Sequence, residues 1–207
     1  MSETLPDGMT PAEAEHLRAL AKEQLRKQLA ALRRTLKPEL RQAYAAQMCA
    51  LLVAHEAFQQ AQVVLAYSPL KFEIDPRPAF AEAWALGKTV ALPRTLPETR
   101  EIVPHVYCQG DPLAESGFVI QEPLVDAPRV EASQVDLVLL PGLGYDLRGQ
   151  RLGFGQGYYD RLLPRLPRAT RIGLAYELSL LVEVPNAAHD APVDFVITER
   201  RVIRCVR

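Results

Sequence analysis

Apolar and polar positions near the start of the chain alternate with the spacing of an α-helix. Apolar residues recur at helical spacing over 17–32 and so share one helix face: Leu17, Leu20, Ala21, Leu25, Leu29 and Leu32. Thr10, Pro11 and Glu13 precede this run. Threonine caps helices, proline suits the first helical position, and a glutamate three residues after the cap completes a capping box. The pattern predicts a helix that begins at Thr10-Pro11, followed by a second helix over about residues 38–58.

After Gln62 the pattern changes to short apolar runs rich in β-branched residues, with helix-like stretches near 78–86 and 158–163. The runs at 63–67 and 135–140 are almost entirely apolar, as expected of parallel strands buried on both faces. The predicted strands cover residues 63–67, 89–92, 102–103, 135–140, 171–175 and 193–198, with 201–206 as an edge strand or hairpin partner. This alternation predicts a single three-layer α/β/α domain with a Rossmann-like, mostly parallel sheet.

Composition and charge narrow the class of protein. The 207 residues include 24 Lys and Arg against 25 Asp and Glu, so the net charge of −1 argues against a general polyanion binder. The cysteines, Cys49, Cys108 and Cys205, match neither a disulfide framework nor a zinc pattern. No apolar run approaches the roughly 18 residues of a membrane span, and the acidic start does not resemble a signal peptide. We therefore expect a cytoplasmic protein.

Glycine is concentrated in one segment. Six of the eleven glycines lie between residues 142 and 157, after a predicted strand and before a predicted helix. Ligands of open α/β sheets bind at the carboxyl ends of strands, and a glycine-rich turn there lets backbone N–H groups approach phosphate. The segment contains neither a Walker A motif nor a G-x-G-x-x-G fingerprint. Its spacing alone leaves open a phosphate loop or a surface loop of tight turns.

Basic residues accompany this segment and the first helix. Arg151 lies inside the glycine run, and a guanidinium group binds phosphate oxygens in pairs. Between residues 22 and 41, seven Lys or Arg face only two Glu. Lys22 and Arg26 are four apart and share one helix face. A two-pronged phosphate grip and an ordinary exposed basic face are both open interpretations of this helix.

Together these residues resemble the 5-formyltetrahydrofolate cyclo-ligase family, also called 5,10-methenyltetrahydrofolate synthetases. The resemblance is strongest over 141–161, and residues 22–26 are similar to the Lys-x-x-x-Arg element of the family. It covers roughly residues 18 to 200. We expect residues 1–15 to be a variable extension and residues 16–207 to form one domain. The resemblance also implies a fold like that of the ribose-phosphate isomerase and CoA-transferase group.

The family implies an enzyme that uses ATP and Mg²⁺ to convert 5-formyltetrahydrofolate to 5,10-methenyltetrahydrofolate, with release of ADP and phosphate. Phosphorylation of the formyl oxygen would allow N10 of the folate to attack and close the ring. The partners implied are small molecules, with no nucleic acid and no membrane, and we expect a monomer. Two alternatives are a sugar-phosphate isomerase or deaminase on the same fold, and a non-catalytic nucleotide- or RNA-binding module.

The resemblance further implies roles for individual residues. Arg151, Lys22 and Tyr158 would be catalytic. Ser68 and Glu73, again with Tyr158, would bind the folate. Asp160 and Asp194 would hold Mg²⁺, although a helix-start carboxylate and a strand-end cap are the alternative interpretations of these two residues. The residues implied in ATP binding are Lys22, Arg26, Arg151, Leu152, Gly153, Phe154, Gly155, Gln156, Gly157, Tyr158 and Tyr159.

Overall fold

The computed structural model describes residues 9–117, 120–186 and 190–206, and its centre is a mixed β-sheet. The strands of this sheet are β1 (Val63–Leu65), β2 (Thr89–Leu96), β3 (Glu101–Val106), β6 (Leu137–Leu140), β9 (Thr170–Leu174), β11 (Phe195–Ile197) and β12 (Val202–Arg204). Their order across the sheet is β12-β11-β9-β6-β1-β2-β3. Only the outermost pairs, β11–β12 and β2–β3, are antiparallel. The predicted mostly parallel sheet and its late edge strand are confirmed.

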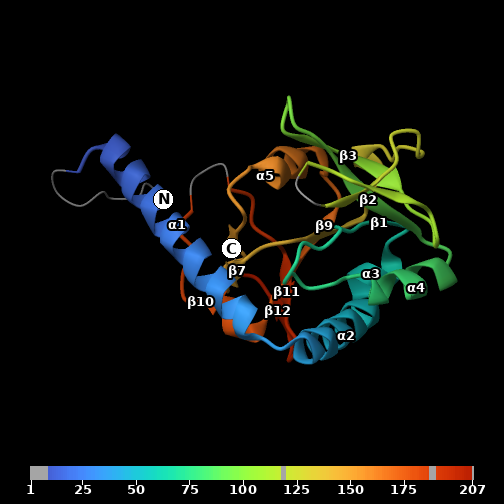
Figure 1. Cartoon of the computed structure of the whole chain (residues 1–207), viewed down its shortest axis with the longest axis horizontal. Helices are drawn as coiled ribbons and strands as arrows, with labels where there is room; N and C mark the ends of the chain where they lie inside the picture. Colours follow the sequence, from blue (N-terminus) through green and yellow to red (C-terminus); the bar gives the residue numbers. More distant parts are fainter. Residues whose placement is uncertain (1–8, 118–119, 187–189, 207) are drawn as a thin grey trace.

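Helices cover both faces of the sheet, which gives the predicted three layers (Figure 1). On one face lie α2 (Pro38–Ala54), α3 (Glu56–Gln60) and α4 (Pro78–Ala85). On the other lies α5 (Tyr158–Leu162) with the 3₁₀ turn η2 (Leu163–Arg165). Each face has its own apolar cluster, which follows from strands whose side chains point alternately to opposite sides. Two further 3₁₀ turns are η1 (Ala132–Gln134) and η3 (Glu177–Ser179).

The predicted second helix is two helices, because the chain becomes extended at His55 (φ −73°, ψ 138°). The Nδ1 atom of His55 accepts the N–H of Ala57 at 3.1 Å and so caps the start of α3. Met48 and Leu52 of α2 are fully buried, whereas Tyr44 and Leu51 are only partly buried at the edge of the same cluster.

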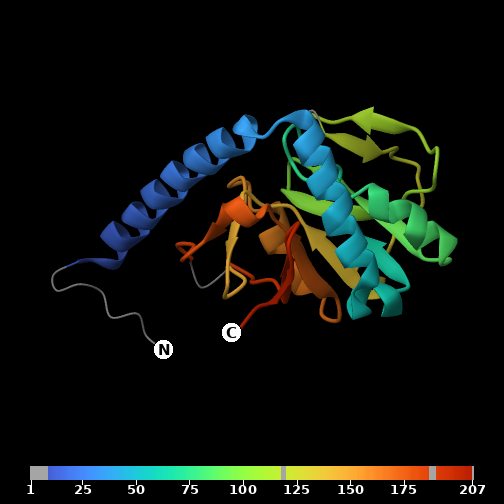
Figure 2. The same ribbon diagram turned by 90° about the horizontal axis from the view of Figure 1, so that it is seen from below.

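The first helix, α1 (Pro11–Thr35), has the predicted capping box. The N–H of Glu13 donates to Thr10 Oγ1 at 3.3 Å, and the Glu13 carboxylate accepts the N–H of Thr10 at 2.8 Å. The helix extends away from the body of the protein (Figures 1 and 2), and its leucines Leu17 and Leu20 are about half exposed. Helix α1 begins within the expected extension, whose residues 1–8 lie outside the described residues.

Two small sheets complete the described fold. Strands β7 (Gly144–Asp146) and β8 (Arg151–Leu152) form a hairpin, and β10 (Leu180–Leu181) pairs in parallel with β7. The glycine-rich segment is therefore partly a hairpin, which the sequence pattern did not predict. A second hairpin, β4 (Leu113–Glu115) with β5 (Gln121–Pro123), packs against the far end of β2. Leu29 of α1 joins Leu143, Leu152 and Val184 in a third apolar cluster.

A buried arginine fixes α1 to the start of the glycine-rich segment. Arg33 is 2% exposed, and its Nη2 donates to the carbonyl oxygens of Gly142 and Leu143. Its guanidinium also lies 5.7 Å from the centre of the Tyr176 ring. Because buried carbonyls need donors, Arg33 stabilises the turn that leads from β6 into β7. None of the described helices is both long enough and apolar enough to cross a membrane.

Candidate active site

A cavity of about 280 Å³ opens where strands β1, β2 and β6 end. This edge of a parallel sheet is the expected ligand position in open α/β folds. Most of the residues implied in catalysis or binding line it, although they come from distant parts of the chain. The lining residues are Tyr67, Ser68, Leu70, Glu73, Pro93, Thr95, Ile102, Ile120, Glu122, Pro141, Arg151, Gly153, Phe154, Gly155, Gln156, Gly157, Tyr158, Tyr159 and Asp160.

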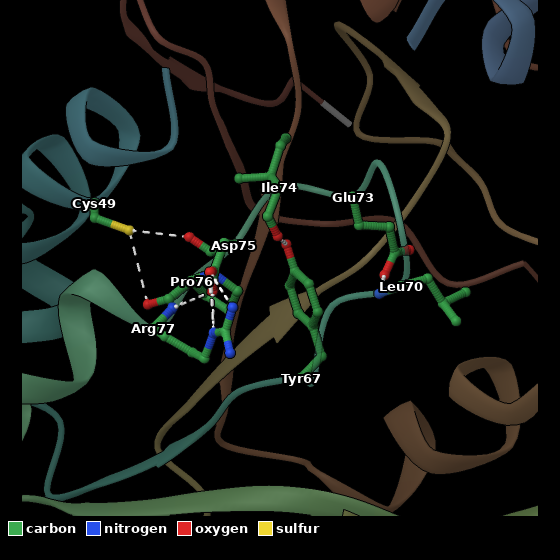
Figure 3. A network of polar contacts seen from close by, with 8 residues as sticks. All are labelled: Cys49, Tyr67, Leu70, Glu73, Ile74, Asp75, Pro76 and Arg77. Carbon is green, nitrogen blue, oxygen red and sulfur yellow. Dashed lines mark hydrogen bonds and ion pairs between the residues drawn. The ribbon is translucent and has the colours of Figure 1, made fainter. Parts of the chain in front are cut away.

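A tight turn after β1 places Glu73 in this cavity (Figure 3). The Glu73 N–H donates to the carbonyl of Leu70 at 2.9 Å, and the Leu70 N–H donates to Glu73 Oε2 at 2.7 Å. The Tyr67 hydroxyl donates to the carbonyl of Ile74 at 2.8 Å, which fixes the far end of the segment. Oε1 of Glu73 is buried and has no partner among the described residues. It is therefore available to a ligand that offers a donor.

Burial decides the protonation behaviour of Glu73. It raises the pKa of the carboxyl group above its ordinary value, while the Leu70 N–H and the positive charge of Arg33 act in the opposite direction. The turn also contains Phe72 at a φ of +73°, which is unusual for a bulky residue. Guanidinium and ammonium groups flank the Phe72 ring, from Arg41 at 4.8 Å and Lys71 at 5.3 Å. These contacts stabilise a strained turn that directs Glu73 inward.

The glycine loop forms another part of the cavity wall and needs glycine at two positions. Gly155 has a φ of +89° and Gly157, the N-cap of α5, a φ of +71°. Residues other than glycine rarely adopt this left-handed backbone conformation. A Cβ atom at Gly155 would lie 3.3 Å from Cζ of Arg26, whose Nε donates to the carbonyl of Gly153 at 2.9 Å. Helix α1 therefore brings Arg26 to the loop, where the family resemblance had placed it.

Arg151 lies in the cavity wall next to the loop, with its side chain 8% exposed. Its Nη2 donates to Asp160 Oδ1 at 2.9 Å, and its Nη1 donates to the carbonyl of Pro141 at 3.2 Å. The guanidinium lies 5.5 Å from the centre of the Tyr159 ring. Burial raises the pKa of Tyr159, although Arg151 opposes this shift, so the phenol stays neutral. Arg151 is thus a fixed cation whose charge is balanced by one carboxylate.

Lys22 takes a different position from Arg26. Its Nζ forms an ion pair with Asp190 Oδ2 at 2.6 Å, and both side chains are less than one fifth exposed. Lys22 does not line the cavity. Lys22 lies one helical turn before Arg26 on α1. Its partner Asp190 was not among the residues expected in the site.

The two expected magnesium ligands are not brought together. Asp160 lines the cavity, whereas Asp194 immediately precedes β11 and its Oδ2 accepts the N–H of Arg171 at 2.8 Å. The cavity lies at the carboxyl ends of the parallel strands. A residue that precedes its strand lies at the opposite, amino-terminal side of the sheet. Within the described ranges, no group of three or more His, Cys, Asp or Glu side chains is arranged to hold a metal ion.

A third wall of the cavity was missed by sequence reasoning. It comes from β2, β3 and the segment around β5, and its lining residues are Pro93, Thr95, Ile102, Ile120 and Glu122. Glu122 is only 3% exposed, and its Oε1 accepts the N–H of Thr95 at 3.2 Å and the Thr95 hydroxyl at 2.7 Å. No short motif marks these residues, because they meet only when β5 packs against β2.

Comparison with known proteins identifies the family. The model of the 5-formyltetrahydrofolate cyclo-ligase family matches residues 18–199, which is most of the chain. The chain belongs to this family. The 5-formyltetrahydrofolate cyclo-ligase of Escherichia coli K12 is similar, with 29% identity over 174 residues that cover 82% of this chain and 96% of that one. The cyclo-ligase of Mus musculus is 27% identical over 190 residues, covering 86% and 94%.

A solved structure agrees with both the sequence match and the fold. The NMR structure of Aquifex aeolicus 5,10-methenyltetrahydrofolate synthetase has 35% sequence identity and a TM-score of 0.79, and the similarity covers 90% of this chain and 93% of that one. The cyclo-ligase family and these relatives are named as ligases, so the chain is an enzyme of this class. The family match agrees with the predicted span of about 18 to 200.

Proposed function

We propose that the chain catalyses the ATP-dependent cyclisation of 5-formyltetrahydrofolate to 5,10-methenyltetrahydrofolate, with release of ADP and phosphate. The observation that carries this proposal is one cavity that is lined by two unlike kinds of group. Arg151 and the glycine loop offer a cation and backbone donors, which suit phosphate. Glu73 offers a buried, unpartnered carboxylate oxygen, which suits the N–H groups of a pterin ring.

The chemistry explains why phosphate-binding groups and a folate-binding carboxylate are needed in one cavity. The formyl group on N5 is an amide, so its carbon is a poor electrophile and its oxygen a poor leaving group. Transfer of the terminal phosphoryl group of ATP to that oxygen activates the carbon. The lone pair of N10 then forms the new C–N bond, N10 loses its proton, and the C–O bond breaks with its electron pair leaving on phosphate. The enzyme must hold the nucleotide, the formyl oxygen and N10 in one arrangement.

The basic residues and the loop serve the phosphoryl transfer. Catalysis of this step rests mainly on positioning and on stabilising negative charge. Arg151 would bind the transferring phosphoryl group, and Gly153, Gly155 and Gly157 would surround the polyphosphate with backbone. The α1 side chains Lys22 and Arg26 would contribute charge from behind the loop. Phe154 and Gln156 line the cavity and would complete the nucleotide site. Leu152, expected in this site as well, does not line the cavity and is buried in the apolar cluster with Leu29.

The folate would occupy the end of the cavity formed by the segment after β1. Glu73 Oε1 would accept an N–H of the pterin ring, and Ser68 would line the same region. Tyr158 and Tyr159 at the start of α5 line the cavity and would flank both substrates. Because Glu73 is held by its own turn, it would bind without a large rearrangement.

Magnesium fits this site only as an ion held chiefly by phosphate. Mg²⁺ commonly binds through one or two carboxylates together with substrate phosphates and water. Asp160 provides one such carboxylate in the cavity wall, whereas Asp194 does not line the cavity. When bound, the ion would neutralise phosphate charge. Asp160 would hold it, and Arg151 would exchange its carboxylate partner for a phosphate oxygen.

One assay tests the proposal. The purified protein is incubated with ATP, Mg²⁺ and 5-formyltetrahydrofolate, and the near-ultraviolet absorbance of the methenyl product is followed. We expect absorbance to rise only when all three are present. No rise with folded protein would contradict the proposal. An isomerase or deaminase would act without ATP, and a binding module for RNA would bind in a salt-dependent way without turnover. The expected monomer stays a prediction, which light scattering would test.

A further inference from the structure

The cavity contains a carboxylate for which the chemistry described above has no role. Three acidic side chains line the cavity among the described residues: Glu73, Glu122 and Asp160. Asp160 is paired with Arg151 at 2.9 Å. Glu73 is assigned to the pterin ring. Glu122 is the most deeply buried of the three by exposed surface, at 3%, and none of the described Lys, Arg or His side chains forms an ion pair with it.

The hydrogen bonds of Glu122 leave one oxygen for a ligand. Both bonds from described residues, from the N–H and the hydroxyl of Thr95, go to Oε1. Thr95 fixes the carboxylate in a cavity that Ile102 and Ile120 also line. Burying a carboxylate without a cation is costly. The arrangement suits a ligand that brings positive charge into the cavity, because a charge among apolar walls interacts more strongly than in water.

The proposed reaction generates a positive charge of this kind. 5-Formyltetrahydrofolate is neutral at its reacting carbon. When N10 has attacked, lost its proton and displaced phosphate, the product carries one positive charge shared over N5, the bridging carbon and N10. The charge forms between the phosphate loop, which carries the activating group, and the turn of Glu73, which holds the pterin ring. Glu122, on β5, lines the same cavity as the glycine loop and Glu73.

We propose that Glu122 is a further catalytic residue, whose free carboxylate oxygen faces the reacting centre of the folate and stabilises the cation formed on ring closure. The inference rests on the proposed cyclo-ligase function and extends it. Preorganised charge directed at a developing charge is a large source of catalysis, because it costs no reorganisation during the reaction. A carboxylate here also disfavours a ligand whose negative group enters this wall.

The test compares two folates that differ at the reacting centre. Equilibrium affinities for 5-formyltetrahydrofolate and 5,10-methenyltetrahydrofolate are measured without ATP, for the wild type and for Glu122→Gln. Glutamine has almost the same shape, and its carbonyl oxygen still accepts from Thr95, so the wall is preserved while the charge is removed. Glu115→Gln, an exposed carboxylate on neighbouring β4, serves as the matched control.

We expect Glu122→Gln to weaken binding of the cationic methenyl compound at least tenfold and binding of the neutral formyl compound less than threefold. In the complete assay, kcat should fall at least tenfold with little change in the KM for ATP. Equal weakening of both folates, or weakening of neither, would overturn the role of Glu122. Because binding is measured without turnover, this result is distinct from a wild-type protein that shows no cyclo-ligase activity, which would contradict the proposed function instead.

Discussion

The guanidinium of Arg151 and the carboxylate of Asp160 form an ion pair at 2.9 Å in the wall of the cavity. Arg151 is almost completely shielded from water, so its position is set before any ligand binds. An incoming phosphate would replace Asp160 as its partner, and the released carboxylate would face the same cavity. In the proposed function, this pair would supply a cation for phosphate and a carboxylate for Mg²⁺ at adjacent positions.

Replacement of Arg151 tests the phosphate role. We expect Arg151→Ala to lower turnover by more than tenfold, which corresponds to about 1.4 kcal/mol of lost transition-state stabilisation. The turnover of Arg151→Lys should lie between that of the wild type and that of Arg151→Ala, because lysine keeps the charge but loses the two-pronged geometry. Arg165→Ala, an exposed arginine on η2, is the control and should keep wild-type turnover. Steady-state kinetics and circular dichroism would check rate and fold together. A loss smaller than tenfold contradicts the assignment.

Replacement of Glu73 tests the folate role. Glu73→Gln removes the charge but keeps the size and one oxygen for the Leu70 N–H. We expect the KM for 5-formyltetrahydrofolate to rise about tenfold or more, since a charged hydrogen bond contributes roughly 1.5–3 kcal/mol. The KM for ATP should stay within twofold of the wild type. An effect confined to ATP would be inconsistent with Glu73 as a folate ligand.

The same substitution should have an opposite effect on stability. Burial raises the pKa of Glu73 above its ordinary 4.5, so folding favours the protonated form. This contribution to stability is present at a pH below the unfolded pKa and is lost as the pH rises through the folded pKa. We therefore expect Glu73→Gln to be more stable than the wild type at neutral pH, and the difference to shrink in acid. Urea unfolding at several pH values measures it, and a gap that does not vary with pH argues against this prediction.

Two glycines share a left-handed backbone conformation, and their substitution distinguishes an effect on the loop's function from an effect on stability. Gly155 and Gly110 have φ values of +89° and +88°, and nothing lies within 4 Å of a Cβ atom at Gly110. We expect alanine at either position to lower the free energy of unfolding by about 1–2 kcal/mol, the cost of a left-handed residue. Only Gly155→Ala should also lower turnover severalfold, because its Cβ atom meets Arg26. Equal turnover in both variants would count against the loop as the nucleotide site.

The ion pair of Lys22 with Asp190 gives a test of the first helix. We expect Lys22→Ala to raise the KM for ATP about tenfold, whereas Lys27→Ala, exposed on the same helix, should not change it. Asp190→Asn separates two roles for Lys22, because it removes the ion pair and leaves the ammonium group in place. A phosphate-binding Lys22 predicts a small effect of Asp190→Asn. If both variants behave alike, Lys22 acts only by holding Asp190.

Local features of the fold were predictable from sequence because they depend on near neighbours. The capping box of Thr10 and Glu13 needs only residues three apart. The buried runs at 63–67 and 135–140 predict central strands because both of their faces are apolar. The loop of the cavity was predictable because its glycines and Arg151 lie in one contiguous segment, which resembles the cyclo-ligase family. One break in a predicted helix, at His55, was missed because it depends on a side-chain cap.

Tertiary structure determined which of these residues are buried and which line the cavity. Apolar spacing predicts a helix at Leu17 and Leu20 but not burial, because these leucines lie on the part of α1 that extends from the body. Asp194 precedes its strand while the cavity lies where strands end, so a sequence match could not show which of the two carboxylates lines the cavity. Glu122 meets Thr95 only through the packing of β5 on β2. Sequence thus determined the long first helix, the strands of the central sheet and the segment that carries the loop. The positions of the charges were set by long-range packing, because an electrostatic partner is chosen by distance in space and not along the chain.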